Sequence, residues 1–140
     1  MGPQSYTSLN EPNEMVATQY QQAIIDSLLE SIPTNVIPDT LQIVPVFDLQ
    51  SNRYQLLCQG WTSGEKRVFH PVIHIEIING KVWIQHNQTD VDIGEELSNR
   101  GIPKSQMVLG LHPPSIRELN PIYDPGADEL DNGAIKSAIY

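Results

Sequence analysis

Two histidines and a glutamate occupy alternate positions of one apolar segment, where their spacing could support metal chemistry. His70, His74 and Glu76 are separated by even numbers of residues, and such spacing directs strand side chains to one face. His74 and Glu76 could then bridge a divalent metal ion. Two ligands make a poor metal site, however, and Pro71 disturbs the alternation at His70. We therefore interpret His74 and Glu76 as a hydrogen-bonded pair at an interface and expect no metal or other cofactor.

Other catalytic patterns lack their partner residues. Cys58 is the single cysteine, which excludes an internal disulfide or a thiolate metal cage. The order His-x-Glu at residues 74–76 is not followed by the P-C-x-x-C of zinc deaminases. The sequence contains no acid-x-Lys pair of the nuclease type and no Gly-rich phosphate loop. We expect a protein that is not an enzyme. The alternative is a metal-dependent enzyme or nuclease subunit that uses His74 and Glu76.

The charge balance restricts the partners. The chain has 17 acidic and 8 basic residues and a formal net charge of −9. This excess repels phosphate backbones, so direct nucleic-acid binding is not expected, whereas a basic protein partner is favoured. No apolar run approaches the length of a membrane span, and the N-terminus lacks the regions of a signal peptide. A single cysteine in a strand-like run is typical of a reduced compartment. We expect a cytoplasmic protein that does not enter a membrane.

The strongest structural signal is a hairpin around Asn79 and Gly80. Both residues tolerate positive φ, as a type I′ turn requires. The turn predicts that His74 lies opposite Gln85 and that His86 faces the other way. One face of the hairpin is aliphatic and is expected in the core: Ile73, Ile75, Ile77, Val82 and Ile84. The other face is mixed: Val72, His74, Glu76, Ile78, Lys81, Trp83 and Gln85.

Helices and further strands surround this hairpin. Apolar residues at three- and four-residue steps predict a helix from Asn13 or Glu14 to Ser31. Strands are expected over residues 41–47 and 54–61, and Pro45 places the first at an edge or a bulge. A second helix follows a cap at Thr89. The chain length suits one domain. We therefore predict an α+β fold, with a four-stranded antiparallel meander sheet, an N-terminal helix and a second helix.

The two ends are expected to differ from this domain. Residues 1–13 are polar and turn-rich and are interpreted as a tail. Residues 14–117 form the domain, in which residues 107–111 could add a short buried strand. Residues 118–140 are acidic and rich in turn-forming residues, so we interpret them as an extension with little structure unless a partner orders it.

Three stretches together resemble a known family. YQLL and GW within residues 54–61, VIHIEIINGKVWIQHNQT at 72–89 and EELSNRGIPKSQMVLGLHPP at 95–114 are similar to the XisI family, the controlling factors of fdxN-element excision in cyanobacteria. The resemblance covers residues 15–117. It implies a curved antiparallel sheet flanked by helices and a non-catalytic, accessory role in site-specific DNA rearrangement. It also implies a XisH-like partner, related to nucleases.

We combine these observations in one candidate interface. A Trp among aliphatic residues, with polar neighbours, has the composition of an interface centre with a polar rim. We expect this face, with Trp83 exposed on it, and the closing His-Pro-Pro segment to bind the XisH-like protein and to support a homo-oligomer. The candidate residues are Val72, His74, Glu76, Ile78, Trp83, Gln85, His112, Pro113 and Pro114.

Overall fold

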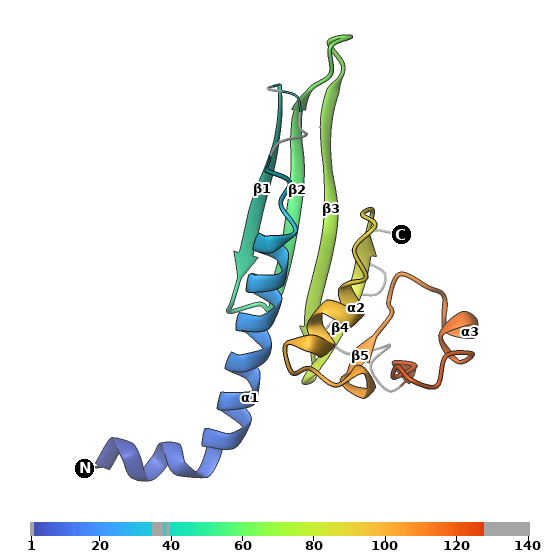
Figure 1. Ribbon diagram of the computed structural model, residues 1–140. Helices are drawn as coiled ribbons and strands as arrows, with labels where there is room; N and C mark the ends of the chain where they lie inside the picture. The colour runs from blue at the N-terminus through green and yellow to red at the C-terminus, as the bar shows by residue number, and fades with distance from the viewer. Residues whose placement is uncertain (1, 35–37, 39, 128–140) are drawn as a thin grey trace, which may run out of the picture.

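A computed structural model describes the backbone of residues 2–34, 38 and 40–127, with side chains from Glu14 onward. A long helix precedes a sheet, and shorter helices follow it (Figure 1). The elements are α1 (Gly2–Glu30), β1 (Leu41–Asp48), β2 (Arg53–Trp61), β3 (Arg67–Ile78), β4 (Lys81–Asn87), α2 (Ile93–Asn99), the 3₁₀ helix η1 (Lys104–Gln106), β5 (Met107–Val108) and α3 (Pro114–Arg117). No described helix is both long enough and apolar enough to span a bilayer.

The sheet is mixed, which corrects the expected four-stranded antiparallel sheet. Strands β1 to β4 form the antiparallel meander, and β5 adds a fifth strand parallel to β4. The chain reaches β5 through α2 and η1, and a crossover of this kind returns the chain in the direction of the preceding strand. Pro45 lies in β1, which is an edge strand as expected.

The central turn is confirmed, but the register beyond it changes. Asn79 and Gly80 have φ of 50° and 80°, as a type I′ turn requires. The expected pairing holds from Ile78 as far as Ile75. A bulge then places His86, rather than Gln85, opposite His74. The extra residue shifts every later pair, which the turn alone does not reveal.

The aliphatic face of the hairpin lies in the core. Ile73 and Ile75 are fully buried, and Ile84 is nearly so. The central turns of α1 cover this face with a stripe of buried side chains, including Ile24 and Leu28. We call this the inner face, and Ile77 is partly buried beside it.

Helix α1 begins earlier than expected. Residues 2–13, which we interpreted as a tail, are helical. Pro12 lies inside the helix, where it cannot donate a hydrogen bond, and the helix bends in its N-terminal part (Figure 1). Further along, Gln21 Nε2 donates to Asn52 Oδ1 at 2.8 Å and to the carbonyl of Leu49 at 3.1 Å. These bonds dock α1 on the β1–β2 turn. The division into a domain and two extensions stays a prediction.

Helix α2 is held at both ends by local hydrogen bonds. Asp92, rather than Thr89, is its N-cap, and the Asp92 carboxylate accepts from the Glu95 amide at 3.0 Å. At the other end Gly101 has a φ of 102°. The Gly101 amide donates to the carbonyl of Ser98, and the Ile102 amide donates to that of Leu97. This pattern is a Schellman motif, and it directs Ile102 into the core.

The chain after β5 has more structure than expected. Residues 109–127, here called the C-terminal segment, fold back over β4. The backbone amide of Asp124 donates a hydrogen bond to the Met107 carbonyl. The Asp124 carboxylate accepts a hydrogen bond from Lys81 Nζ at 2.6 Å. The part of the expected extension at residues 128–140 lies outside the described residues.

Candidate interaction surface

The polar candidates meet on the sheet face opposite α1, here called the outer face. His74 Nε2 lies 2.8 Å from Glu76 Oε2, and His74 Nδ1 lies 3.0 Å from Gln55 Oε1. Gln85 Nε2 donates to Glu76 Oε1 at 3.4 Å. Arg53 Nη1 lies 3.6 Å from the same carboxylate. The structure thus joins the expected pair, His74 and Glu76, directly, and three neighbouring side chains extend the network over three strands.

This network engages both side chains of the expected pair. The hydrogen bond from His74 holds the pKa of Glu76 below its ordinary value, against the opposing effect of burial, and Arg53 adds to the lowering. A carboxylate with a lowered pKa is a weak general base near neutral pH. Both ring nitrogens of His74 are already engaged. Among the described residues no group of three or more His, Cys, Asp or Glu side chains could hold a metal ion.

The other candidates for chemistry lie apart from this network. His70 pairs with Cys58 across β2 and β3 and is exposed. Cys58 is a free, buried thiol, as its strand position predicted. His112 is exposed and lines a cavity of about 120 Å³ with Asn87 and Val91. No hydrogen bond in the described part of the chain connects His112 with His74 or Glu76.

The exposure expected for Trp83 is wrong. Only 6% of this residue is accessible. The Arg117 guanidinium lies 5.2 Å from the indole centroid. Gly126 approaches so closely that a Cβ atom there would lie 2.8 Å from Cη2 of the indole. The C-terminal segment therefore covers Trp83, and glycine permits that close approach. The loop-like composition of the segment did not indicate this packing.

The remaining candidates are distributed over three environments. Val72 packs against the core cluster, beside the register shift between β2 and β3, and does not accompany Trp83. Ile78 is partly buried near the β3–β4 turn. His112, Pro113 and Pro114 are exposed. These three stay a predicted binding segment, but they form a surface separate from the His74–Glu76 network.

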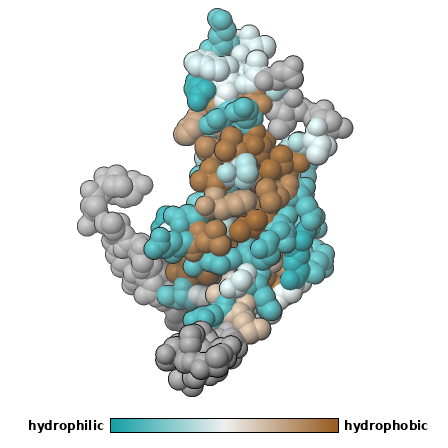
Figure 2. Space-filling view, turned by 90° about the vertical axis from the view of Figure 1, so that its left-hand side faces the viewer, coloured by the Kyte–Doolittle hydropathy of each residue, from teal (hydrophilic) through white to brown (hydrophobic). Residues whose placement is uncertain are grey.

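The larger apolar surface lies elsewhere on the outer face. Trp61 is 50% exposed, Phe69 62% and Val46 42%. The strand register places further apolar residues between them, with Val44 opposite Leu57 and Leu57 opposite Pro71. We call this group the apolar strip: Val44, Val46, Leu57, Trp61, Phe69 and Pro71. Figure 2 shows hydrophobic side chains gathered in the middle of the molecule when it is viewed from the β1 side.

Sequence reasoning missed this strip, although a signal for it exists. Extending the alternation of β2 beyond Gln55 places Leu57 and Trp61 on the outer face. One cation lies within the strip, because the Arg67 guanidinium is 5.4 Å from the Trp61 ring centroid and 5.9 Å from that of Phe69. Exposed Trp and Arg side chains are the types most enriched at the energetic centres of interfaces.

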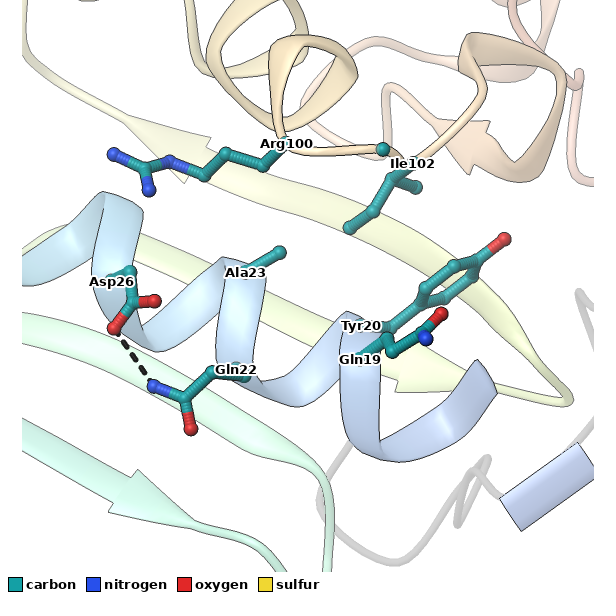
Figure 3. Close-up of a pocket in the computed structure, with 8 residues that line it drawn as sticks. Gln19, Tyr20, Gln22, Ala23, Asp26, Arg100 and Ile102 are labelled. Atoms are coloured by element: carbon teal, nitrogen blue, oxygen red, sulfur yellow. Dashed lines mark hydrogen bonds between the residues drawn. The ribbon is translucent and has the colours of Figure 1, made fainter. Parts of the chain in front are cut away.

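A cavity of about 360 Å³ lies between α1 and the loop after α2. Figure 3 shows Arg100 and Ile102 above the helix that carries Tyr20, Ala23 and Asp26. Its charged groups have partners outside or beside it. Arg100 Nη2 lies 2.7 Å from Glu30 Oε1, and Gln22 donates to Asp26 at 2.8 Å. The cavity therefore separates two packed elements and presents no set of reactive groups.

The sequence matches the family described as XisI protein over residues 15–121. The chain belongs to the XisI family. Two solved structures from Anabaena variabilis ATCC 29413 are similar to it. A XisI-like protein is 32% identical with a TM-score of 0.71, over 77% of this chain and 97% of that one. The fdxN element excision controlling factor XisI is 34% identical with a TM-score of 0.67, over 79% and 98%. No curated protein matches the chain.

Family membership confirms the resemblance found in the sequence and the α+β class of the fold. The match ends at residue 121. Asp124, which bonds to Lys81, and Gly126, which packs against Trp83, therefore lie beyond the matched residues.

Proposed function

We propose that this XisI-family chain controls excision of a DNA element by binding other proteins and catalyses no reaction itself. Two findings support a controlling role: the family match over residues 15–121 and the 34% identity to a protein described as the fdxN element excision controlling factor. One observation carries the binding mechanism. The apolar strip leaves 62% of Phe69 and 50% of Trp61 accessible, and an exposed apolar area of this kind marks an interaction surface.

The partner we propose is a XisH-like, nuclease-related protein, bound through the exposed segment His112–Pro114. Leu111 and Ile116 flank this segment and are 40% and 47% exposed, so apolar and polar groups alternate along it. Proline fixes the backbone before binding, which lowers the entropy lost on association. The net charge of −9 favours a basic partner and repels nucleic acid.

The outer face serves self-association in this proposal. The network of His74, Glu76 and Gln85 forms a polar border beside the apolar strip. Trp83 lies opposite Glu76 in the sheet, beside that border, and the C-terminal segment covers it.

The experiment is co-expression of the tagged chain with the XisH-like protein of the same organism, followed by purification of the complex. His112→Glu, in the exposed segment, should reduce recovery of the partner at least tenfold. Lys66→Glu, exposed on the β2–β3 turn, is the control and should not. Equal recovery with both variants would reject the His-Pro-Pro segment as the docking site.

The same preparations separate binding from catalysis. Purified chain alone, supplied with Mg²⁺ or Mn²⁺, should leave duplex and single-stranded DNA intact and should not retard either in a gel. Cleavage by the wild type that is absent in Glu76→Gln would replace our proposal with a metal-dependent enzyme that uses His74 and Glu76.

A further inference from the structure

The outer-face residues of β3 form an ordered series of chemical types. Along the strand they are a cation, an aromatic ring, a proline, an imidazole and a carboxylate: Arg67, Phe69, Pro71, His74 and Glu76. Read in reverse, the series places a carboxylate where the cation was and an imidazole where the aromatic ring was. A surface with this property is complementary to its own copy when the two run antiparallel.

We propose that a second copy of this chain packs on the outer face, about a two-fold axis that lies between the two sheets and crosses β3 at Pro71. This inference rests on the self-association included in the proposed function and specifies its geometry. A two-fold axis that lies across the strands keeps β3 above β3 and reverses its direction. Arg67 then meets Glu76 of the second copy, and Phe69 meets His74. Each contact occurs twice, as an isologous interface requires.

The outer-face residues of β2 are also complementary to their own copy about this axis. Leu57 lies opposite Pro71 in the sheet, so the axis also crosses β2 at Leu57. Leu57 of one copy then packs against Leu57 of the other. Gln59 meets Gln55 of the second copy. Trp61 meets Arg53, whose side chain is 59% exposed, and an arginine above an indole is a favourable cation–π pair.

The shape of the chain fits this arrangement as well. Strand β4 pairs with β3 only from Ile73 onward, so the half of β3 that begins at Arg67 pairs with β2 but has no strand on its β4 side. In Figure 1 the β2–β3 hairpin extends far beyond β4, while the C-terminal segment lies beside the opposite end of the sheet. The two-fold rotation places the C-terminal segment of one copy beside the bare half of β3 in the other. Leu119 and Ile122, 76% and 61% exposed on this segment, would then face protein.

The surface is large enough for a reversible dimer. Three strands of nine residues cover about 14 Å by 30 Å, or about 400 Å² of projected area per copy. The accessible area of a surface with side chains is larger than its projection, so the face approaches the roughly 800 Å² per partner of a standard interface. Twisted sheets pack at about 30° to each other. The facing residues at the two ends of the strands are therefore displaced sideways from one another, and the long side chain of Arg67 can bridge that displacement.

Face-to-face packing is favoured over joining of the sheets at their edges. Strand β1 is an edge of the sheet, and Pro45 lies in its middle. Proline removes a backbone donor, which weakens an exposed edge as a site for another strand. The charged residues of the outer face also favour face-to-face packing of two copies. Glu76 is the single acidic residue among the outer-face positions of β2 and β3, and Arg53 and Arg67 balance it.

The test uses disulfide trapping in the full-length chain with Cys58→Ala, which removes the natural thiol. Two variants, Trp61→Cys and Arg53→Cys, are oxidised separately and after mixing. Both positions are exposed, so folding is retained. The mixture should give a covalent dimer between unlike chains, and each variant alone should remain uncrosslinked, because the axis brings position 61 to position 53 and not to itself.

Sedimentation equilibrium gives the second measurement. Phe69→Lys places a cation opposite His74 and should raise the dimer dissociation constant at least tenfold. Leu49→Lys, on the β1–β2 turn and 53% exposed, is the matched control and should change it less than twofold. Circular dichroism of both variants should match the wild type.

Three results would overturn the inference. A wild type that remains monomeric at several hundred micromolar excludes this dimer. A dimer that gives no crosslink in the mixture shows that self-association uses another surface. A dimer weakened equally by Leu49→Lys and Phe69→Lys excludes the strip as its centre. Recovery of the XisH-like partner, measured separately, decides the proposed function and is independent of all three.

Discussion

Replacement of Trp83 by alanine tests the most consequential difference between expectation and structure. If Trp83 were an exposed interface residue, Trp83→Ala would abolish association and leave folding intact. The structure buries it beneath Arg117 and Gly126. We therefore expect the substitution to destabilise the fold, with the C-terminal segment detached from β4.

The expected magnitude follows from burial. A tryptophan side chain that loses about 200 Å² of accessible surface on folding contributes about 5 kcal/mol at 25 cal/mol per Å², an upper value. Measured Trp→Ala substitutions in cores cost about 3–5 kcal/mol. Loss of the Arg117 contact adds about 0.5–2 kcal/mol. Because a domain of this size is stable by about 5–15 kcal/mol, Trp83→Ala should remove a large share of its stability.

Urea unfolding followed by circular dichroism measures this loss. Leu49→Ala is the control, since a residue that is 53% exposed should change the unfolding free energy by no more than about 0.5 kcal/mol. Fluorescence provides a second readout. In Trp61→Phe the remaining tryptophan is Trp83, and acrylamide should quench it poorly.

Two results would refute this reasoning. The first is a Trp83→Ala variant whose unfolding free energy lies within about 1 kcal/mol of the wild type, since that is far below the cost of a core cavity. The second is efficient acrylamide quenching of Trp61→Phe. Either result would place the indole in solvent and return it to the candidate interface.

Three further substitutions test the packing and the polar network. Ile75→Asp buries an unpaired charge and should prevent cooperative folding, whereas Leu49→Asp, 53% exposed, should melt as the wild type does. Gly126→Ala should cost about 1–3 kcal/mol, because its φ is +73° and the added Cβ meets an indole atom at 2.8 Å. Gly64→Ala is the control and should be neutral in thermal unfolding, because its added Cβ would lie at ordinary contact distance, 3.8 Å from Thr62 Oγ1. Glu76→Gln should be less stable than the wild type near neutral pH, and this difference in unfolding free energy should disappear in acid. The folded pKa of Glu76 is lowered, so its contribution is fully present above the ordinary value of 4.5 and disappears as pH falls through the folded pKa; a difference that stays constant from pH 7 to pH 3 would contradict the network.

Local chemistry made the central hairpin predictable. Asn79 and Gly80 adopt the positive φ that their residue types allow, and the inner-face alternation from Ile73 to Ile77 follows from the strand period. Pro45 placed β1 at an edge for an equally local reason. The family resemblance, carried by 54–61, 72–89 and 95–114, is confirmed over residues 15–121.

What the sequence did not reveal depends on contacts between distant segments. The bulge in β4 moves His86 opposite His74, and no turn residue marks its position. The parallel pairing of Met107 with Val82 depends on where α2 and η1 return the chain. Neither feature leaves a periodic pattern, because each involves one or two residues whose partners lie elsewhere.

The C-terminal segment explains why the candidate interface lies on the apolar strip and not around Trp83. Periodicity separated an inner from an outer face except at Val72, which packs against the core beside a register shift. It could not say which part of the outer face another segment covers. Asp124 bonds to Lys81, and Gly126 fits against Trp83, so the chain itself covers the outer face over β4, while His74 and Glu76 on β3 stay partly exposed. The half beyond Ile73 has no such cover, and there Phe69 and Trp61 remain accessible. Because the cover and the bare half lie at opposite ends of one sheet, a second copy can place its cover where the first copy has none. The same fold that buries Trp83 thus leaves an apolar strip of matching shape for association.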